Sequence, residues 1–164
     1  VLFRSAEDVK RLMHYEDYSA GGMMTTEPIV LTADSTVAEA LARVRSSEVA
    51  PGLAAQVFVC RQPLETPTGR FMGVVHIQRL LREPPSTLLG GILDKDIMPL
   101  SVDTSLNEIS LYLASYNLLS VPIVDANDRL LGAVTVDDVL DHLLPENWRH
   151  DESLKQESEA TQNG

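Results

Sequence analysis

The chain has 164 residues, of which 44% are hydrophobic, so it is long enough for one domain or two small ones with a buried core. Its formal net charge is −11, and only part of this charge comes from residues 146–164, which hold five acidic and two basic side chains. We therefore expect an acidic folded part that repels nucleic acid and anionic membranes. Such a surface would suit divalent cations, with solubility alone as the alternative explanation.

Cys60 is the only cysteine, so no intramolecular disulfide can form, which fits a reducing interior. No apolar run approaches the roughly 18–20 residues of a membrane span, and no secretory signal is visible. We therefore expect a soluble, cytoplasmic protein. Residues 1–5, VLFRS, are set aside as a candidate sequencing artefact, and the chain is then expected to be an N-terminally truncated fragment.

The first half of the chain predicts short strands that alternate with helices. Ser35 or Thr36 would cap the helix that follows, and Glu39 suits a capping box with either of them. In chain order we predict helix 6–13, an apolar stretch from Met23, helix 37–45, strand 56–59, strand 71–75 and helix 77–82.

The second half repeats this order after the linker REPPSTLLGG. Thr104 or Ser105 would cap a helix, with Glu108 in the place of Glu39. The residues DANDR form a hairpin turn between two strands, and the tail after Pro145 is expected to be disordered. In chain order we predict helix 106–116, strand 120–124, strand 130–134 and a closing helix.

Two pairs of segments carry this repeat. MMTTEPIVLTADSTVAEAL, from Met23, matches ILDKDIMPLSVDTSLNEIS, and FMGVVHIQRLL matches LLGAVTVDDVL. One strand–helix–strand–strand–helix unit is too small to bury its sheet alone, so two units packed sheet to sheet would share a core, with ligand clefts between them. We predict an α+β fold of two pseudo-symmetric units. The predicted boundaries are an N-terminal helical remnant at 1–22, units at 23–85 and 98–145, a linker at 86–97 and a tail at 146–164.

The joint between the last strand and the closing helix combines a hydroxyl group with carboxylates. Thr135 lies where its oxygen can cap the helix. The alternative is a ligand site, because a helix N-terminus offers donors to phosphate and Asp138 could accept from a ribose hydroxyl. Asp137, Asp138 and Asp141 are either a solvated helix face or a weak magnesium site, since Mg²⁺ often takes only one or two carboxylates.

The tandem units, closed by GAVTVDD, resemble a pair of CBS domains, also called a Bateman module. HYEDYSAGGMMTTEPIVLTADSTVAEAL, ILDKDIMPLSVDTSLNEI and VPIVDANDRLLGAVTVDDVLD are similar to the CBS region of MgtE-type magnesium transporters, over residues 6–145. The resemblance implies a regulatory module that binds an adenine nucleotide (AMP, ADP or ATP), senses Mg²⁺ and closes an attached pore. It also implies a homodimer, with a transporter pore or another effector domain as partner.

Carried over residue by residue, the resemblance implies one nucleotide site in the second unit. Thr135 would bond a phosphate and Asp138 the ribose, while Asp137 and Asp141 would lie near Mg²⁺. The run LLSVP, residues 118–122, would form a pocket for the adenine ring, and packing in the hydrophobic core is the alternative interpretation of this run. That pocket would be lined by Leu118, Leu119, Ser120, Val121 and Pro122 and covered by Ile97 and Met98.

The first unit departs from the family pattern. His76 and Arg79 stand where the family usually has a hydroxyl and an aspartate, and Gln78–Arg79 replaces a basic–acidic pair that contributes to ATP binding. The equivalent site there is therefore expected to be degenerate, with one good site per module.

Two other classes of function remain as alternatives. Cys60, His76 and the aspartates are ingredients of nucleophilic catalysis, but no local signature places a base and an orienting group beside Cys60, so we assign no catalytic residue. The other alternative is a structural dimerisation module without a small ligand.

Overall fold

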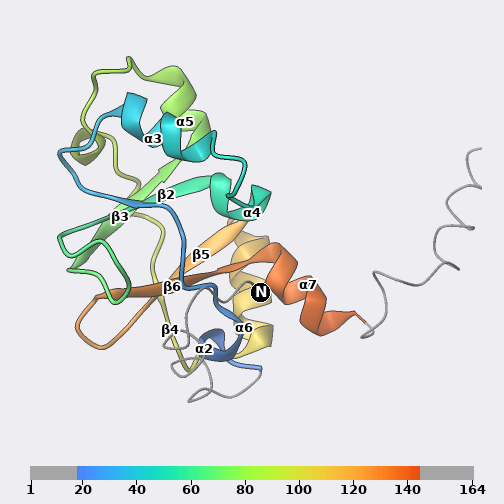
Figure 1. The fold of residues 1–164 in the computed structure, drawn as a ribbon. Helices are drawn as coiled ribbons and strands as arrows, with labels where there is room; N and C mark the ends of the chain where they lie inside the picture. Colours follow the sequence, from blue (N-terminus) through green and yellow to red (C-terminus); the bar gives the residue numbers. More distant parts are fainter. Residues whose placement is uncertain (1–17, 145–164) are drawn as a thin grey trace, which may run out of the picture.

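Two three-stranded sheets form the centre of the protein (Figure 1). The computed structural model describes residues 18–144, so the predicted helix 6–13 and the polar tail lie outside the described residues. In each sheet the first two strands are parallel and the last two antiparallel. The first sheet holds β1 (Val30–Leu31), β2 (Gln56–Cys60) and β3 (Phe71–His76), and the second holds β4 (Leu100–Ser101), β5 (Ser120–Val124) and β6 (Leu130–Thr135).

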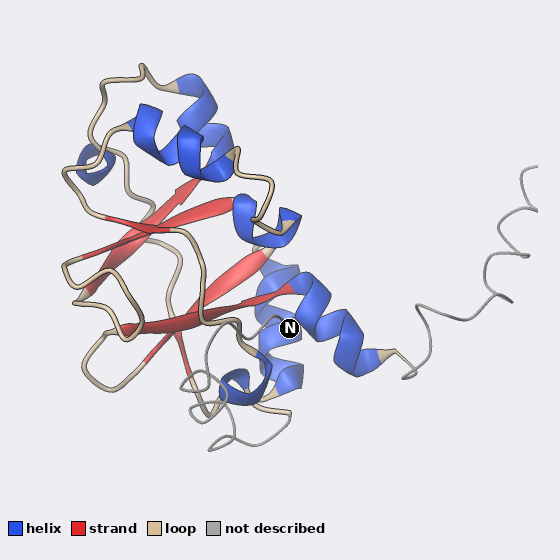
Figure 2. Cartoon of the chain, viewed as in Figure 1, coloured by secondary structure: helices blue, strands red, loops and turns tan. Residues whose placement is uncertain are grey.

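Short helices flank both sheets, with α3 and α5 beside the first and α6 and α7 beside the second (Figure 2). Thr36 caps α3 by accepting a hydrogen bond from Glu39 N at 3.2 Å, and Ser105 caps α6 in the same way. The predicted caps and the predicted α+β class are therefore confirmed. The helices are α2 (Ala20–Met23), α3 (Val37–Val44), α4 (Pro51–Ala54), α5 (Ile77–Arg82), α6 (Leu106–Ser115) and α7 (Val136–Leu143), with a 3-10 turn at Leu89–Gly91.

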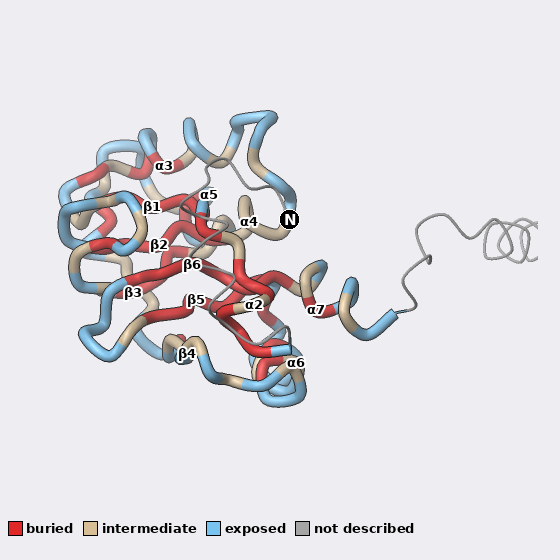
Figure 3. Tube along the Cα trace, turned by 60° about the horizontal axis from the view of Figure 1, so that its bottom comes forward, coloured by how far each residue is buried: buried red, intermediate tan, exposed pale blue. Residues whose placement is uncertain are grey.

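One hydrophobic core joins the two units. Phe58 and Val74 of the first sheet pack in the same cluster as Val121 and Val134 of the second. Neighbouring strand residues such as Val57 face the other side, where a second cluster lies under α3 and α5. Figure 3 shows the buried strands at the centre and exposed loops around them. The sheet-to-sheet packing predicted from the repeat is confirmed.

The segment that leads into each unit crosses over to the other unit. We call residues 18–28 the first lead-in segment and residues 87–98 the second. Thr25 exchanges backbone hydrogen bonds of 2.9 Å in both directions with Ala133 of β6. Asp94 makes the equivalent pair with Val74 of β3, at 2.7 and 3.2 Å. Because of this crossing, the clefts between the units are built from both repeats.

Candidate functional clefts

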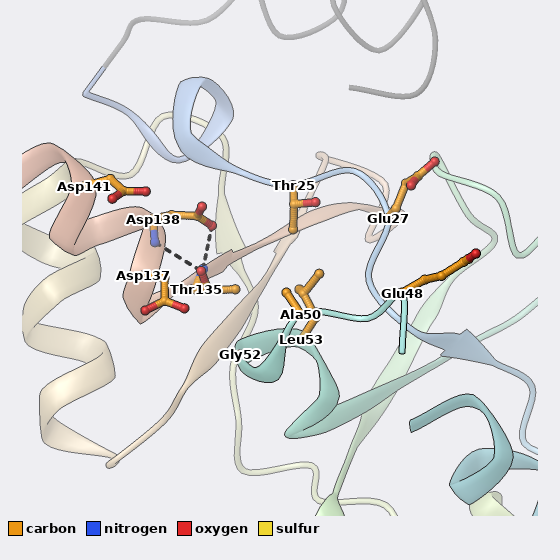
Figure 4. Close-up of a pocket in the computed structure, with 10 residues that line it drawn as sticks. All are labelled: Thr25, Glu27, Glu48, Ala50, Gly52, Leu53, Thr135, Asp137, Asp138 and Asp141. Atoms are coloured by element: carbon orange, nitrogen blue, oxygen red, sulfur yellow. Dashed lines mark hydrogen bonds between the residues drawn. The ribbon is translucent and has the colours of Figure 1, made fainter. Parts of the chain in front are cut away.

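Two clefts lie at equivalent places between the units. Each combines the strand–helix joint of one unit with the lead-in segment of the other. Cleft A has a volume of 230 Å³ and is lined by Thr25, Glu27, Glu48, Ala50, Gly52, Leu53, Thr135, Asp137, Asp138 and Asp141 (Figure 4). Cleft B has a volume of 340 Å³ and is lined by Ala55, Gln56, His76, Ile77, Gln78, Asp94, Ile97, Tyr116, Asn117, Leu118 and Leu119.

The residues predicted to form one nucleotide pocket are divided between these clefts. The joint residues Thr135 and Asp138 line cleft A, together with Asp137 and Asp141, which were assigned to magnesium. The residues predicted to hold adenine do not join them. Ile97, Leu118 and Leu119 line cleft B, Met98 is 62% exposed and lines neither cleft, and Ser120, Val121 and Pro122 are buried within β5. The structure therefore does not bring the predicted pocket residues together in one cleft, because the crossed lead-in segments set each joint opposite the other unit.

Thr135 and Asp138 cap α7 reciprocally. Thr135 Oγ1 accepts a hydrogen bond from Asp138 N at 3.1 Å, and Asp138 Oδ2 accepts one from Thr135 N at 3.0 Å. Burial raises the pKa of Asp138 above its usual value, against the hydrogen bonds from Thr135, and the negative charge of Asp141 raises it further. The N-cap interpretation of Thr135 is therefore confirmed, and both side chains already satisfy backbone donors.

Cleft A is strongly acidic. Three of its carboxylates come from α7, and Glu27 and Glu48 lie across the cleft from them (Figure 4). None of its lining residues, all within the described part of the chain, is basic. Within residues 18–144, no group of three or more histidine, cysteine, aspartate or glutamate side chains is arranged to hold a metal ion. Cleft A thus offers negative potential to a hydrated cation and repels phosphate.

Cleft B is close to neutral, with apolar walls. Ile77 of the first unit faces Ile97, Leu118 and Leu119 of the second, while Gln56 accepts a hydrogen bond from buried Ser120 at 2.5 Å. Arg79, which was singled out in the sequence, does not line the cleft and pairs with Glu83 at 2.6 Å.

Asp94 is the carboxylate of cleft B, and the sequence prediction did not include it. Its Oδ2 lies 2.8 Å from His76 Nε2, and its Oδ1 accepts from Asp96 N at 2.9 Å. Burial acts to raise the pKa of Asp94, but these hydrogen bonds and the charge of His76 outweigh burial, so the pKa is lowered. The repeat could have indicated this residue, because Asp94 aligns with Thr25 of the first lead-in segment, which lines cleft A.

The structure does not support Cys60 as a catalytic nucleophile. Cys60 is fully buried in the shared core. Burial raises the pKa of its thiol to about 11, despite a hydrogen bond with Thr68 that acts to lower it. A buried thiol with such a pKa holds almost no thiolate near neutral pH and is unreactive.

Comparisons with known proteins agree with this architecture. The model of the CBS domain family matches residues 16–86 and 89–145. The magnesium transporter MgtE of Enterococcus faecalis is 32% identical over 136 residues, which cover 83% of this chain and 29% of the relative. MgtE of Thermus thermophilus is 32% identical over 143 residues, which cover 87% of this chain and 31% of the relative.

A solved structure shows the same similarity. The crystal structure of the cytosolic domain of the Mg²⁺ channel MgtE in complex with ATP superposes with a TM-score of 0.71 at 31% identity, covering 83% of this chain and 53% of that one. Among residues 18–144, no helix is long and apolar enough to cross a membrane.

Proposed function

Since the chain belongs to the CBS-domain family, with two CBS domains in tandem, we propose that it is a regulatory module that binds an adenine nucleotide in cleft B. The observation that carries this proposal is the lining of cleft B, which combines apolar walls from both units with amide groups and a single carboxylate. An adenine ring fits such walls, since ligand pockets are mostly apolar with a few orienting polar groups. The ATP complex of the related MgtE cytosolic domain supports the choice of ligand.

Electrostatics favour cleft B over cleft A for a phosphate-bearing ligand. Two like charges 4 Å apart repel by about 1 kcal/mol in water and about 4 kcal/mol near a protein surface. Five carboxylates line cleft A, whereas the one carboxylate of cleft B, Asp94, is paired with His76. A phosphate at Thr135 and a ribose at Asp138, as the family resemblance implies, form the competing placement.

Calorimetry with AMP, ADP and ATP tests both placements. Leu119→Glu sets a charge in cleft B at a side chain that is 52% exposed, so it should weaken binding at least tenfold while the fold persists. Asp138→Ala changes cleft A instead, by removing the side chain that would hold the ribose there, and should leave the nucleotide affinity nearly unchanged. The opposite pattern would place the nucleotide in cleft A. If the wild-type chain bound none of the three nucleotides, the structural dimerisation alternative would stand.

The acidic lining of cleft A favours Mg²⁺ as a second ligand. Mg²⁺ keeps several waters and often takes only one or two carboxylates, so Asp137 and Asp141 suffice as ligands without a preformed cage. A cation that binds only the compact form stabilises it by about 2.7 kcal/mol when the free cation concentration is about 100 times the dissociation constant.

Melting curves and solution scattering in MgCl₂ and in NaCl of matched ionic strength test this second ligand. MgCl₂ should raise the melting temperature further, because NaCl screens charges without bridging carboxylates. Asp137→Asn with Asp141→Asn should remove the difference, while Glu65→Gln with Asp103→Asn, two exposed residues outside cleft A, should keep it. Identical curves for wild-type protein in the two salts would exclude Mg²⁺ sensing.

The shared core supports a particular route of signal transmission. Phe58 of one unit and Val121 of the other belong to the same buried cluster, so the angle between the two units resists change. The ligand would then act on contacts outside the chain, namely a homodimer interface or an attached transporter pore. Both partners are proposals, because the chain spans only 29% and 31% of the length of the two MgtE relatives.

A further inference from the structure

His76 occupies, in cleft B, the position that Thr135 occupies in cleft A, but it does not perform the same task. It precedes α5 as its N-cap residue, and its side chain makes no capping hydrogen bond. Its Nε2 instead bonds Asp94 of the second lead-in segment, and both side chains line the cleft. Each is 32% exposed, so a ligand in the cleft can reach them.

Asp94 is held firmly enough to orient this imidazole. Its backbone pairs in both directions with Val74 of β3, two residues before His76, and its second carboxylate oxygen accepts from Asp96 N. A carboxylate accepts hydrogen bonds only, so the proton of the pair lies on Nε2 of His76. Nδ1 has no hydrogen-bond partner among the described residues and is the ring nitrogen left for a ligand.

The state of Nδ1 decides what the cleft offers to a phosphate. In the neutral ring Nδ1 is an acceptor and faces phosphate oxygens unfavourably, whereas in the imidazolium it is a donor. The other titratable group that lines the cleft is Tyr116 of the α6 end. Lys95 and Asp96 flank Asp94 in the lead-in segment, and Arg79 of α5 is already paired with Glu83.

We propose that His76 is a phosphate-contacting, specificity-determining residue of cleft B, oriented by Asp94, and that it strengthens nucleotide binding as the pH falls. This inference rests on the proposed function and adds a mode of regulation to it. The imidazolium form of His76 would donate a charge-assisted hydrogen bond from Nδ1 to the phosphate, while the hydrogen bond between Nε2 and Asp94 holds the ring in place.

Calorimetry at about pH 5.5 and about pH 8.0 tests this proposal, because histidine is the side chain whose charge ordinarily changes between about pH 5 and pH 8. The ligands are AMP, adenosine 5′-sulfate and adenosine. The sulfate ester keeps its charge over this range, while the AMP phosphate itself titrates near pH 6. Wild-type protein should bind the sulfate ester roughly tenfold more tightly at the lower pH, the size of one hydrogen bond to a charged group. Adenosine should bind equally at both.

Three variants separate the role of His76 from general effects of pH. His76→Gln should lose the pH dependence for the sulfate ester, Asp94→Asn should reduce it, and His142→Gln, which changes a histidine of α7, should keep it. Thermal melts at both pH values verify that each variant is folded.

The outcomes distinguish the two proposals. Adenosine binding with no pH dependence for the sulfate ester, or an unchanged pH dependence in His76→Gln, would overturn the role of His76 and leave nucleotide binding intact. No binding of any of the three ligands at either pH would overturn both.

Discussion

Thr25 and Ala133 exchange two backbone hydrogen bonds of 2.9 Å, which place the start of the first repeat on the last strand of the second. The approach is close because residue 132 is a glycine. A Cβ atom at Gly132 would collide with the carbonyl oxygen of Thr25. In the other repeat, a Cβ at Gly73 would lie 3.2 Å from the carbonyl oxygen of Asp94. The crossing of the chain therefore depends on these two glycines to different degrees.

Gly132→Ala should destabilise the protein more than Gly73→Ala. The first change forces two backbones apart and should lower the free energy of unfolding by about 1–3 kcal/mol, as overpacking does. The second requires a shift of a few tenths of an ångström and should have a smaller effect. Urea denaturation of both variants measures the difference, and equal losses would contradict the crossing geometry.

Thr68 ties the long hairpin loop of the first unit to the second unit. Its buried Oγ1 accepts from Leu130 N at 3.0 Å and donates to Gly69 O at 2.6 Å. Thr68→Val removes the acceptor and leaves a buried N–H unpaired, so the free energy of unfolding should fall by about 1–3 kcal/mol. Thr68→Ser keeps the hydroxyl and should lose about 0.8 kcal/mol for one buried methyl group. A valine variant as stable as the serine variant would show that this bond does not hold the loop.

The raised pKa of Asp138 has a consequence for stability. The folded state binds this proton more tightly than the unfolded state, so stability falls as the pH rises from the ordinary aspartate value of 3.8 through the raised value. Asp138→Asn keeps an oxygen acceptor for Thr135 N without the buried charge. We expect its free energy of unfolding at pH 7 to equal or exceed that of the wild type, with the difference gone below pH 3.8.

Asp138→Ala is the matched control for this prediction. It removes the charge and the acceptor together, so Thr135 N loses its partner. The free energy of unfolding should then fall by about 1–3 kcal/mol below pH 3.8, where the wild-type carboxyl is protonated, and by less at pH 7, where the wild type itself bears the cost of the buried charge. If asparagine and alanine were equally destabilising at pH 7, the charge of Asp138 would matter more than its hydrogen bond.

Cys60 should be protected from thiol reagents in the folded protein. With a pKa of about 11 and complete burial, it can react only after the core opens. Labelling with a coloured disulfide reagent at pH 8 should be roughly a thousandfold slower than in guanidinium chloride, in proportion to the rare open state. Because Cys60 is the only thiol, the signal is unambiguous, and rapid labelling without denaturant would contradict the burial.

Local chemistry made the elements of this fold predictable. Strand 120–124 and helix 77–82 agree with β5 and α5. The other elements predicted with both bounds within the described residues end within one residue of those observed. Thr36, Ser105 and Thr135 were recognisable as caps because a cap depends on contacts within four residues. The four-residue helix α4, which begins at Pro51, was not predicted, since a single turn leaves no periodicity to detect.

The sequence by itself determined the repeated units, their α+β class, the shared core and the family. Only the tertiary structure decided which residues meet in each cleft. The residues around Thr135 face the first lead-in segment, and those around His76 face the second, because backbone pairs such as Thr25–Ala133 cross between units. These pairs join residues far apart in the chain through N–H and C=O groups that every residue except proline carries, so no side-chain pattern records them.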